Sequence, residues 1–468
     1  MAVGIAALSL ILLMIAAYRG MSVIVMAPLL AMLAVFLTDP GAVPAVFSGL
    51  FMEKVGSFLK LYFPVFLLGA LFGKLIEISG FSRVIVTAVI RLVGAQRAIP
   101  AIMLVTALLT YGGVSVFVAV FAVYPFAAEM FRQGDIPKRL VPATIGLGAI
   151  TFTMDAMPGT PQIQNIIPTS FFGTTAWAAP VLGLIGSVCI MGMGLTYLGW
   201  RKRVLMAAGE GYGAPGTLVN EPEAVAEEEH GGVHPLIALL PLLVVGLGNL
   251  ALTMMIPRIV PGEEVSVSLI GLSGPVVVQV AQVAALWAVE GALLLGIGTI
   301  MLFAFRPVAR RFADGSKAAV GGALLAGMNT AVEYGFGAVI AALPGFLLVK
   351  EALKVVPDPL VNEAITVTSL AGITGSASGG LSIALAAMAE QFAAAGDAAG
   401  IPREVLHRVA SMASGGMDSL PHNGAIITLL AVTGLTHRQA YKDIFALTLI
   451  KTFTVFVVIA VYYLTGLV

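Results

Sequence analysis

Charged residues are scarce in this chain. Asp, Glu, Lys and Arg make up 11% of the 468 residues, while hydrophobic residues make up 59%. Soluble domains contain roughly 25% charged and 45–50% apolar residues, so this composition predicts a polytopic membrane protein. The formal net charge is zero and the sequence has no block of basic residues. Nothing therefore indicates a nucleic-acid partner.

Cysteine and metal-binding patterns are also lacking. Cys189 is the single cysteine and cannot form an internal disulfide. His230 and His234 are four residues apart, but two glycines between them disfavour the helix that a shared metal would need. We therefore expect no metal and no cofactor. The absence of a His-Glu-x-x-His motif and of an Asp-rich motif for prenyl or phosphoryl chemistry argues against an intramembrane enzyme.

Apolar runs of about 20 residues, the length that a membrane-spanning helix needs, are abundant. We predict spans at Ala2–Ala17, Met21–Thr38, Leu61–Ser79, Lys138–Thr169, Thr174–Trp200, Pro235–Ile256, Pro275–Phe305, Ala318–Val349, Arg403–Leu435 and Ile444–Val468. Two further segments, Ala98–Ala128 and Pro359–Ala395, are too long for one span and are interrupted by glycines, which favours re-entrant hairpins. The hydrophilic stretch 205–234 predicts a cytoplasmic linker between membrane units 1–204 and 235–468.

The distribution of basic residues predicts the orientation. Most of the 25 Lys and Arg residues fall in loops on one side when the N-terminus is placed outside, so the positive-inside rule predicts that both termini face outward. Each half then contains five spans and one hairpin. Because five is odd, the second half enters the membrane in the opposite direction. We predict an all-α inverted repeat of two five-helix units, each with a re-entrant hairpin and a broken helix.

The two halves repeat a polar pattern within apolar sequence. Gly112–Ser115 and then Asp155–Pro161 in the first half correspond to Gly379–Ser382 and then Asp418–Gly424 in the second. The offsets are 382 − 115 = 267 and 418 − 155 = 263, so the register hardly drifts. Paired Gly-interrupted and Pro-broken segments are typical of secondary transporters with alternating access, which disfavours an ion channel.

These interruptions place polar groups where a substrate could bind. A carboxylate within the bilayer costs on the order of 2.5–3.5 kcal/mol, so the presence of Asp155 and Asp418 favours a functional role for both. The simpler alternative is that they only cap half-helices. Helix N-termini at the breaks attract anions, and the hairpin glycines and serines either wrap a carboxylate or only permit close packing. The predicted substrate-binding residues are Gly113, Ser115, Asp155, Thr160, Gln162, Asn165, Ser376, Ser378, Ser382 and Asn423.

Asp418, His422 and Glu333 are the predicted proton-coupling residues. Asp418 lies four residues before His422, and a carboxylate beside an imidazole favours the protonated ring. Asp155 has no such neighbour and is expected to orient substrate hydroxyls. Glu333, near the middle of its span, is the next candidate. A hydrogen-bonding histidine and a carboxylate at a subunit interface remain the alternatives.

At these residues the chain resembles the gluconate permease (GntP) family of proton symporters, within the ion-transporter superfamily. The resemblance covers nearly the full length, and its most specific stretches are Met157–Asn165 and Met417–Ala425. It implies elevator-type import of gluconate or a related small hydroxy acid, such as 3-hydroxybutyrate, together with a proton. It also implies a homodimer in the bacterial inner membrane.

Two departures refine this resemblance. The Ser-Asn-Thr hairpin signature of the superfamily is absent, and Gly113–Ser115 and Ser376–Ser382 occupy the comparable positions. A sodium-coupled di- or tricarboxylate carrier is therefore the less favoured alternative. The first break also differs from the pattern of gluconate transporters, which favours a shorter hydroxy acid.

Overall fold

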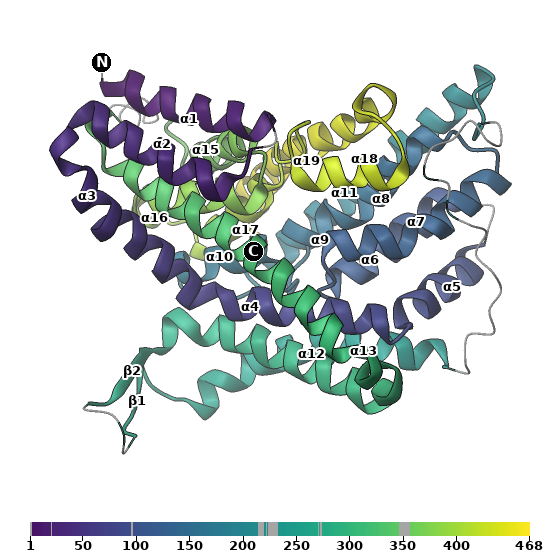
Figure 1. The fold of residues 1–468 in the computed structure, drawn as a ribbon, viewed down its shortest axis with the longest axis horizontal. Helices are drawn as coiled ribbons and strands as arrows, with labels where there is room; N and C mark the ends of the chain where they lie inside the picture. The colour runs from purple at the N-terminus through teal and green to yellow at the C-terminus, as the bar shows by residue number, and fades with distance from the viewer. Residues whose placement is uncertain are drawn as a thin grey trace.

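The computed structural model describes residues 2–19, 21–94, 97–213, 220, 222, 233–269, 271, 274–345 and 356–468. Helices dominate this part of the chain (Figure 1), which confirms the predicted all-α membrane class. Five helical stretches among the described residues are long and apolar enough to cross a bilayer: Pro40–Ile78, Pro180–Ala207, Pro235–Ile259, Gln282–Ala342 and His437–Thr465.

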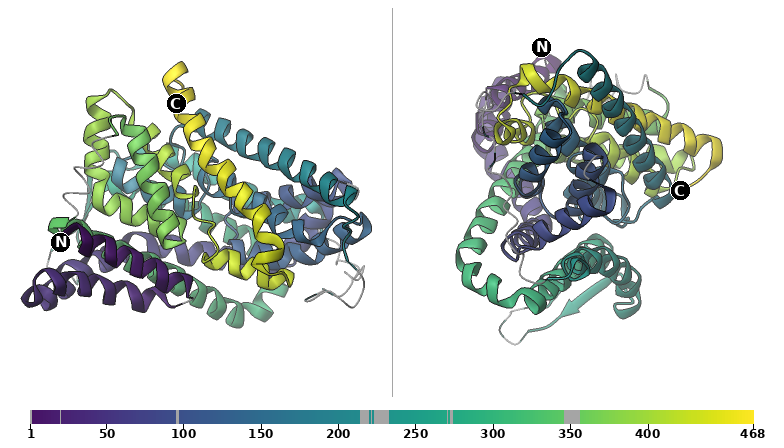
Figure 2. Two further views of the ribbon diagram at one scale, coloured as in Figure 1. Left: turned by 90° about the horizontal axis from the view of Figure 1, so that it is seen from above. Right: turned by 90° about the vertical axis from the view of Figure 1, so that its right-hand side faces the viewer.

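One group of long helices packs together on one side of the molecule. It comprises α1 (Ala2–Tyr18), α2 (Val23–Thr38), α4 (Met52–Ile78), α12 (Pro235–Ile259) and α13 (Val280–Ala342). Seen from above, the purple N-terminal helices lie along one side and the light-green helices along the other, whereas the yellow C-terminal run extends across the molecule (Figure 2). We call this group the outer helices.

The third span begins earlier than the predicted Leu61. The 3-10 turn η1 (Pro40–Ala42), the short helix α3 (Val43–Ala45) and the π-helical segment η2 (Val46–Phe51) continue directly into α4. The buried residues of this stretch recur at helical spacing: Phe51, Val55, Phe58, Tyr62 and Val65. The charged residues Glu53, Lys54 and Lys60 lower the apolar content of this stretch but do not interrupt the series of buried residues. A count of apolar residues alone therefore misplaced the start of the span.

The helical run α13 (Val280–Ala342) contains most of both predicted spans, Pro275–Phe305 and Ala318–Val349. Its backbone leaves helical geometry at Ala304 (φ −131°, ψ 32°). Pro307 lies three residues later and cannot donate the backbone hydrogen bond that would continue the first helix through this point. The chain therefore bends at Ala304, and the basic segment predicted as a loop after Phe305 is helical.

Two helical hairpins lie at the predicted positions. The first consists of α6 (Ala98–Tyr111) and α7 (Val116–Gln133), and the second of α15 (Pro359–Thr374) and α16 (Ala377–Ala398). At 1.5 Å per residue, the 14 residues of α6 extend about 21 Å, which is short of the roughly 30 Å hydrocarbon core. The tip residues Gly112 and Gly375 are buried within the protein. Both features favour re-entrant hairpins over pairs of spans.

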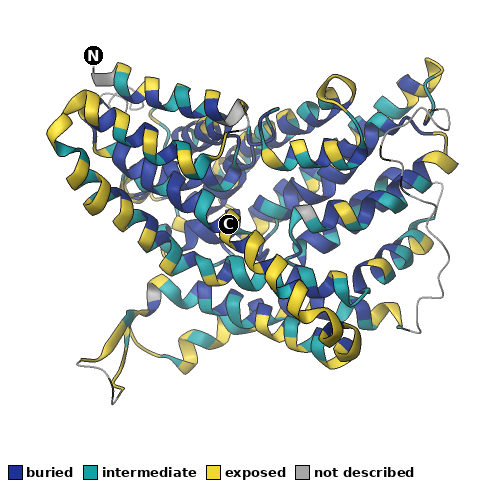
Figure 3. Ribbon diagram, viewed as in Figure 1, coloured by how far each residue is buried: buried dark blue, intermediate teal, exposed yellow. Residues whose placement is uncertain are grey.

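Each half also contains the predicted broken helix. In the first half, α8 (Val141–Ala149) and the short α9 (Phe152–Asp155) are separated by a turn from α10 (Ile163–Phe172). In the second half, α17 (Arg403–Ser414) is separated from α18 (Gly424–Thr433). The hairpins and breaks form the buried centre of the molecule, whereas the outer helices carry many exposed apolar residues on their far faces (Figure 3).

The remaining helices enclose this centre. Helices α11 (Pro180–Ala207) and α19 (His437–Thr465) pack against each other behind the breaks. A 3-10 turn, η3 (Lys138–Leu140), precedes α8. Helix α5 (Phe81–Val93) was not predicted because Arg83 and Arg91 suggested a loop. It buries one face, including Ile85 and Val89, and exposes Arg83 on the other, as an amphipathic helix does.

Two other segments lie outside the helical core. Strands β1 (Glu264–Val267) and β2 (Val276–Gln279) form an antiparallel ribbon, with Glu264 paired to Gln279. No strand was predicted here, and β2 replaces the start of the predicted span Pro275–Phe305. Most of the predicted linker, including His230, lies outside the described residues. Its described start docks onto the first hairpin, where Tyr212 N donates to Asp135 Oδ1 at 2.9 Å.

The arms of the second hairpin meet at a glycine. A Cβ added at Gly380 in α16 would overlap the backbone of Ala371 in α15. We expect Gly380→Ala to lower the stability by about 1–3 kcal/mol, the usual cost of overpacking. Gly322→Ala in α13 is the control, because nothing lies within 4 Å of its added Cβ. Thermal unfolding in detergent would test this, and equal melting temperatures for the two variants would contradict it.

Candidate functional site

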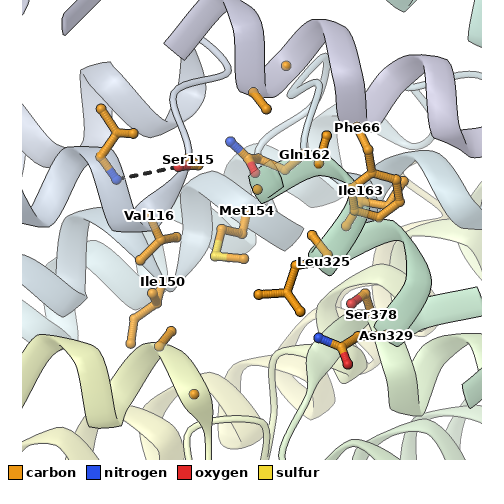
Figure 4. Close-up of a pocket in the computed structure, with 18 of the residues that line it drawn as sticks. Phe66, Ser115, Val116, Ile150, Met154, Gln162, Ile163, Leu325, Asn329 and Ser378 are labelled. Carbon is orange, nitrogen blue, oxygen red and sulfur yellow. Dashed lines mark hydrogen bonds between the residues drawn. The ribbon is translucent and has the colours of Figure 1, made fainter. Parts of the chain in front are cut away.

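A cavity of about 1990 Å³ lies between the outer helices and the hairpins and breaks (Figure 4). Phe66 from α4 and Leu325 and Asn329 from α13 form part of its wall, and Ser115 and Gln162 lie across from them. Nine of the predicted site residues line this cavity: Gly113, Ser115, Gln162, Glu333, Ser376, Ser378, Asp418, His422 and Asn423. Residues more than 300 positions apart in the sequence thus share one space.

The other four predicted site residues lie behind the cavity wall. Asp155, Thr160, Asn165 and Ser382 are buried but do not line the cavity. Asn165 Nδ2 donates to the carbonyls of Thr160 (2.9 Å) and Ala176 (2.8 Å). This side chain therefore satisfies backbone groups that the first break leaves without helical partners.

Four helix N-termini converge on the cavity. Ser115, Gln162, Ser376 and Asn423 are the N-cap residues of α7, α10, α16 and α18, and all four line it. Each N-terminus carries the positive end of a helix dipole together with backbone N–H groups that lack helical acceptors. Both halves of the chain thus contribute positive ends to the same space, as an anion site requires.

The four N-termini are not equivalent. Ser115 Oγ, Ser376 Oγ and Asn423 Oδ1 each accept a hydrogen bond from the first turn of their own helix. Gln162 makes no such bond within the described chain. The first turn of α10 is therefore the one of the four that has no side-chain cap.

The same N-cap amides fasten each break to its hairpin tip. Gln162 Nε2 donates to Thr110 O at 2.7 Å, at the end of the first arm of the first hairpin. Asn423 Nδ2 donates to Gly375 O at 2.8 Å, at the tip of the second. Asn423 therefore caps α18 through its Oδ1 and binds the hairpin tip through its amide hydrogens. Gly113 (φ 96°) and Gly375 (φ 63°) adopt the left-handed conformations that the two tips need.

The main electrostatic partner of both aspartates was missed in the sequence. Lys451 of α19 is 2% exposed, and its Nζ lies 3.3 Å from Asp155 Oδ2 and 3.3 Å from Asp418 Oδ1. It also donates to Ile150 O at 2.8 Å, where the first break begins. The expectation that Asp155 has no charged partner is therefore wrong. Lys451 is a basic residue within an otherwise apolar predicted span, and this isolated charge was the feature of the sequence that could have identified it.

Asp418 and His422 occupy different surroundings at the second break. Asp418 Oδ1 accepts from Ser419 Oγ at 2.8 Å as well as from Lys451. The ring of His422 packs against the second hairpin tip, where a Cβ at Gly375 would overlap it. The structure therefore gives Asp418 a lysine partner, and its predicted pairing with His422 stays a prediction.

A second buried cation, Arg408, connects the second half of the chain to the first. The orientation count placed Arg408 in an outer loop, but it is fully buried in α17. Its guanidinium donates to Ala178 O at 2.7 Å, to Asp155 O at 3.2 Å and to Asn165 Oδ1 at 3.1 Å. Lys451 thus pairs with the aspartates of both breaks, while Arg408 binds backbone and amide oxygens of the first break and its surroundings. Buried charges are tolerated when they are paired and hydrogen-bonded in this way.

Comparison with known proteins now bears on this arrangement. No family model matches the chain. It is 56% identical over 470 residues to a Bacillus subtilis (strain 168) protein described as the uncharacterized transporter YxjC, and the match covers 98% of both proteins. The chain belongs to the family of this transporter. The chain is thus a membrane transporter, and its four convergent helix N-termini lie in a transporter cavity.

A solved structure shares the fold. The crystal structure of the Alcanivorax borkumensis YdaH transporter, described as having an unusual topology, matches with a TM-score of 0.50. The match covers 92% of this chain and 90% of the YdaH chain at 16% sequence identity. At that identity the likeness concerns the arrangement of the helices and not the substrate.

The Lys451 ion pairs generate a stability prediction. Replacing Lys451 with Met leaves two buried carboxylates facing each other, and we expect a loss of about 3–5 kcal/mol, as for other broken buried pairs. Changing both aspartates to Asn in the same protein should recover much of this loss. Lys317→Met is the control, because that side chain is 81% exposed. Thermal unfolding in detergent is the measurement, and an unchanged melting temperature for Lys451→Met would count against the ion pairs.

Proposed function

We propose that the protein is a proton symporter that imports a small organic hydroxy acid, such as 3-hydroxybutyrate or gluconate. The observation that carries this proposal is the convergence of four helix N-termini on one central cavity. Positive helix ends at a midplane cavity bind anionic substrate groups in secondary transporters built from broken helices. A carboxylate is the substrate group that fits them.

The lining of the cavity supports a substrate that also bears hydroxyl groups. Ser115, Gln162, Asn329 and Ser378 provide hydroxyl and amide groups beside apolar side chains such as Val116, Ile163 and Leu325 (Figure 4). Such groups both donate to and accept from an alcohol. The basic residues of the lining are Lys74, Arg83 and Arg311, and Lys74 is already paired with Glu77 at 2.7 Å. One carboxylate with hydroxyl groups therefore suits the centre better than the several carboxylates of a citrate-like substrate.

The packing supports an elevator mechanism. In each half an N-cap amide joins the break to the hairpin tip, and Lys451 joins the two breaks to each other. These bonds hold both hairpins and both breaks together as one body beside the outer helices. Movement of this body past α4 and α13 would carry the substrate site across the membrane. The inverted repeat and the homodimer that the family resemblance implies belong to this proposal.

Transport assays test the substrate and the coupling ion. In proteoliposomes we expect counterflow of labelled 3-hydroxybutyrate or gluconate, with lactate and citrate as comparison substrates. An inward proton gradient should drive accumulation, and replacing sodium with choline should leave it unchanged. Sodium-dependent uptake of citrate without response to a proton gradient would instead establish the sodium-coupled di- or tricarboxylate carrier.

The orientation in the bacterial inner membrane is a separate prediction. The cavity lining includes Arg83 and Arg311, which the positive-inside rule places in the cytoplasm together with an external N-terminus. A single cysteine replacing Arg311, in a variant with Cys189→Ser, should react with an impermeant thiol reagent only from the cytoplasmic side. A cysteine at the exposed Val276 of β2 should react only from outside. The reverse pattern would show that the orientation is wrong.

A further inference from the structure

A carboxyl group of the outer helices faces the second hairpin. Glu333 in α13 is 2% exposed and lines the cavity. Its carboxyl packs directly on Gly379 in α16, because a Cβ added there would overlap both carboxyl oxygens. Its Oε2 has no hydrogen-bond partner among the described residues. A buried carboxyl oxygen without a partner is costly when charged, so this group needs an explanation.

The contact lies at the N-terminal end of α16. Ser376 is the N-cap of this helix, so Gly379 lies in its first turn. The neighbouring hydroxyls of Thr330 and Ser378 are 3.2 Å apart, and a Cβ at Gly337 would overlap Ile383. Residues further along α13 thus contact residues further along α16, so the two helices lie side by side and run in the same direction. A charged Glu333 would be attracted to the positive end of α16.

The elements packed against Glu333 leave its charge uncompensated. Helix α10 has no ionisable side chain of the Asp, Glu, Lys, Arg or His type. The acidic residues of α16, Glu390 and Asp397, lie three or more turns beyond Gly379. At this level of α4, Lys60 is exposed and Lys54 is partly exposed. By contrast, both aspartates of the breaks have buried cations beside them.

We infer that Glu333 is the proton-binding group and that its charge controls the contact between α13 and the second hairpin. When Glu333 is charged, its attraction to the first turn of α16 holds the hairpin against α13. Protonation removes this attraction, so the loaded carrier moves past α13 more readily with its proton than without it. The same positive helix end disfavours a metal cation at this position, so a proton fits better than sodium. This inference rests on the proposed function and adds the site of coupling to it.

The isosteric variant Glu333→Gln is permanently neutral and provides the main test. We expect it to retain counterflow of labelled hydroxy acid, because exchange between loaded states needs no proton release. It should lose accumulation driven by a proton gradient, which in the wild type can reach about tenfold per pH unit for one proton carried with one monoanion. Its counterflow should also become independent of pH, whereas that of the wild type should slow as the pH rises.

Two further variants separate coupling from structure. Glu333→Asp keeps a titratable group and should retain pH-dependent counterflow at a reduced rate. Glu290→Gln neutralises another, less buried carboxyl of α13 and should behave like the wild type. If Glu333→Gln fails to fold, Gly379→Ala provides the same test, because its methyl group displaces the Glu333 carboxyl from α16. That variant should also uncouple accumulation from counterflow.

The outcomes distinguish this inference from the proposed function. If the wild type accumulates a hydroxy acid in a proton gradient and Glu333→Gln accumulates it equally, the inference is wrong and the proposed function stands. The inference is equally wrong if Gly379→Ala stays fully coupled. If the wild type itself neither exchanges nor accumulates any hydroxy acid, the proposed function fails first.

Discussion

The pairing of one lysine with two aspartates is the constraint on which the centre of this protein depends. Lys451 brings together Asp155 and Asp418, which lie 263 positions apart in the two broken helices (418 − 155 = 263). Without the lysine, two carboxylates would face each other away from water, at a cost that packing could hardly offset. With it, each break gains a fixed partner. A glycine follows α17 for the same reason, since a Cβ at Gly415 would overlap both Asp155 and Lys451.

The fixed breaks in turn position the helix ends. A break exposes backbone groups that must find partners, and here they are distributed between protein and cavity. Asn165 and Arg408 satisfy carbonyls on the protein side. On the cavity side, Gln162 and Asn423 bind the hairpin tips and leave the positive ends of their helices facing the substrate space. The polar interior therefore follows from how the two breaks are satisfied.

The sequence predicted the parts of this arrangement that local chemistry determines. Glycines and prolines marked both hairpin tips and both breaks, because these residues interrupt helices wherever they occur. The start of α4 and the helix α5 were missed, since their charged residues lie on exposed faces that a count of apolar residues does not separate. Lys451 and Arg408 were not assigned to the site because Asp155, which both contact, comes from the other half of the chain. Such long-range pairing has no local signal.

The cations near each buried carboxyl distinguish the two aspartates of the breaks from Glu333. Asp155 and Asp418 both lie 3.3 Å from Lys451, and Arg408 donates to the backbone carbonyl of Asp155, so buried cations accompany both carboxyls. A proton added to either carboxyl would weaken the bonds that hold the breaks together. Glu333 has no such compensation, and it lies between the outer helices and the hairpin instead of inside the central body. In the proposed mechanism a coupling proton must change the free energy of movement without dismantling the moving part, and Glu333 is the carboxyl that we infer to bind it.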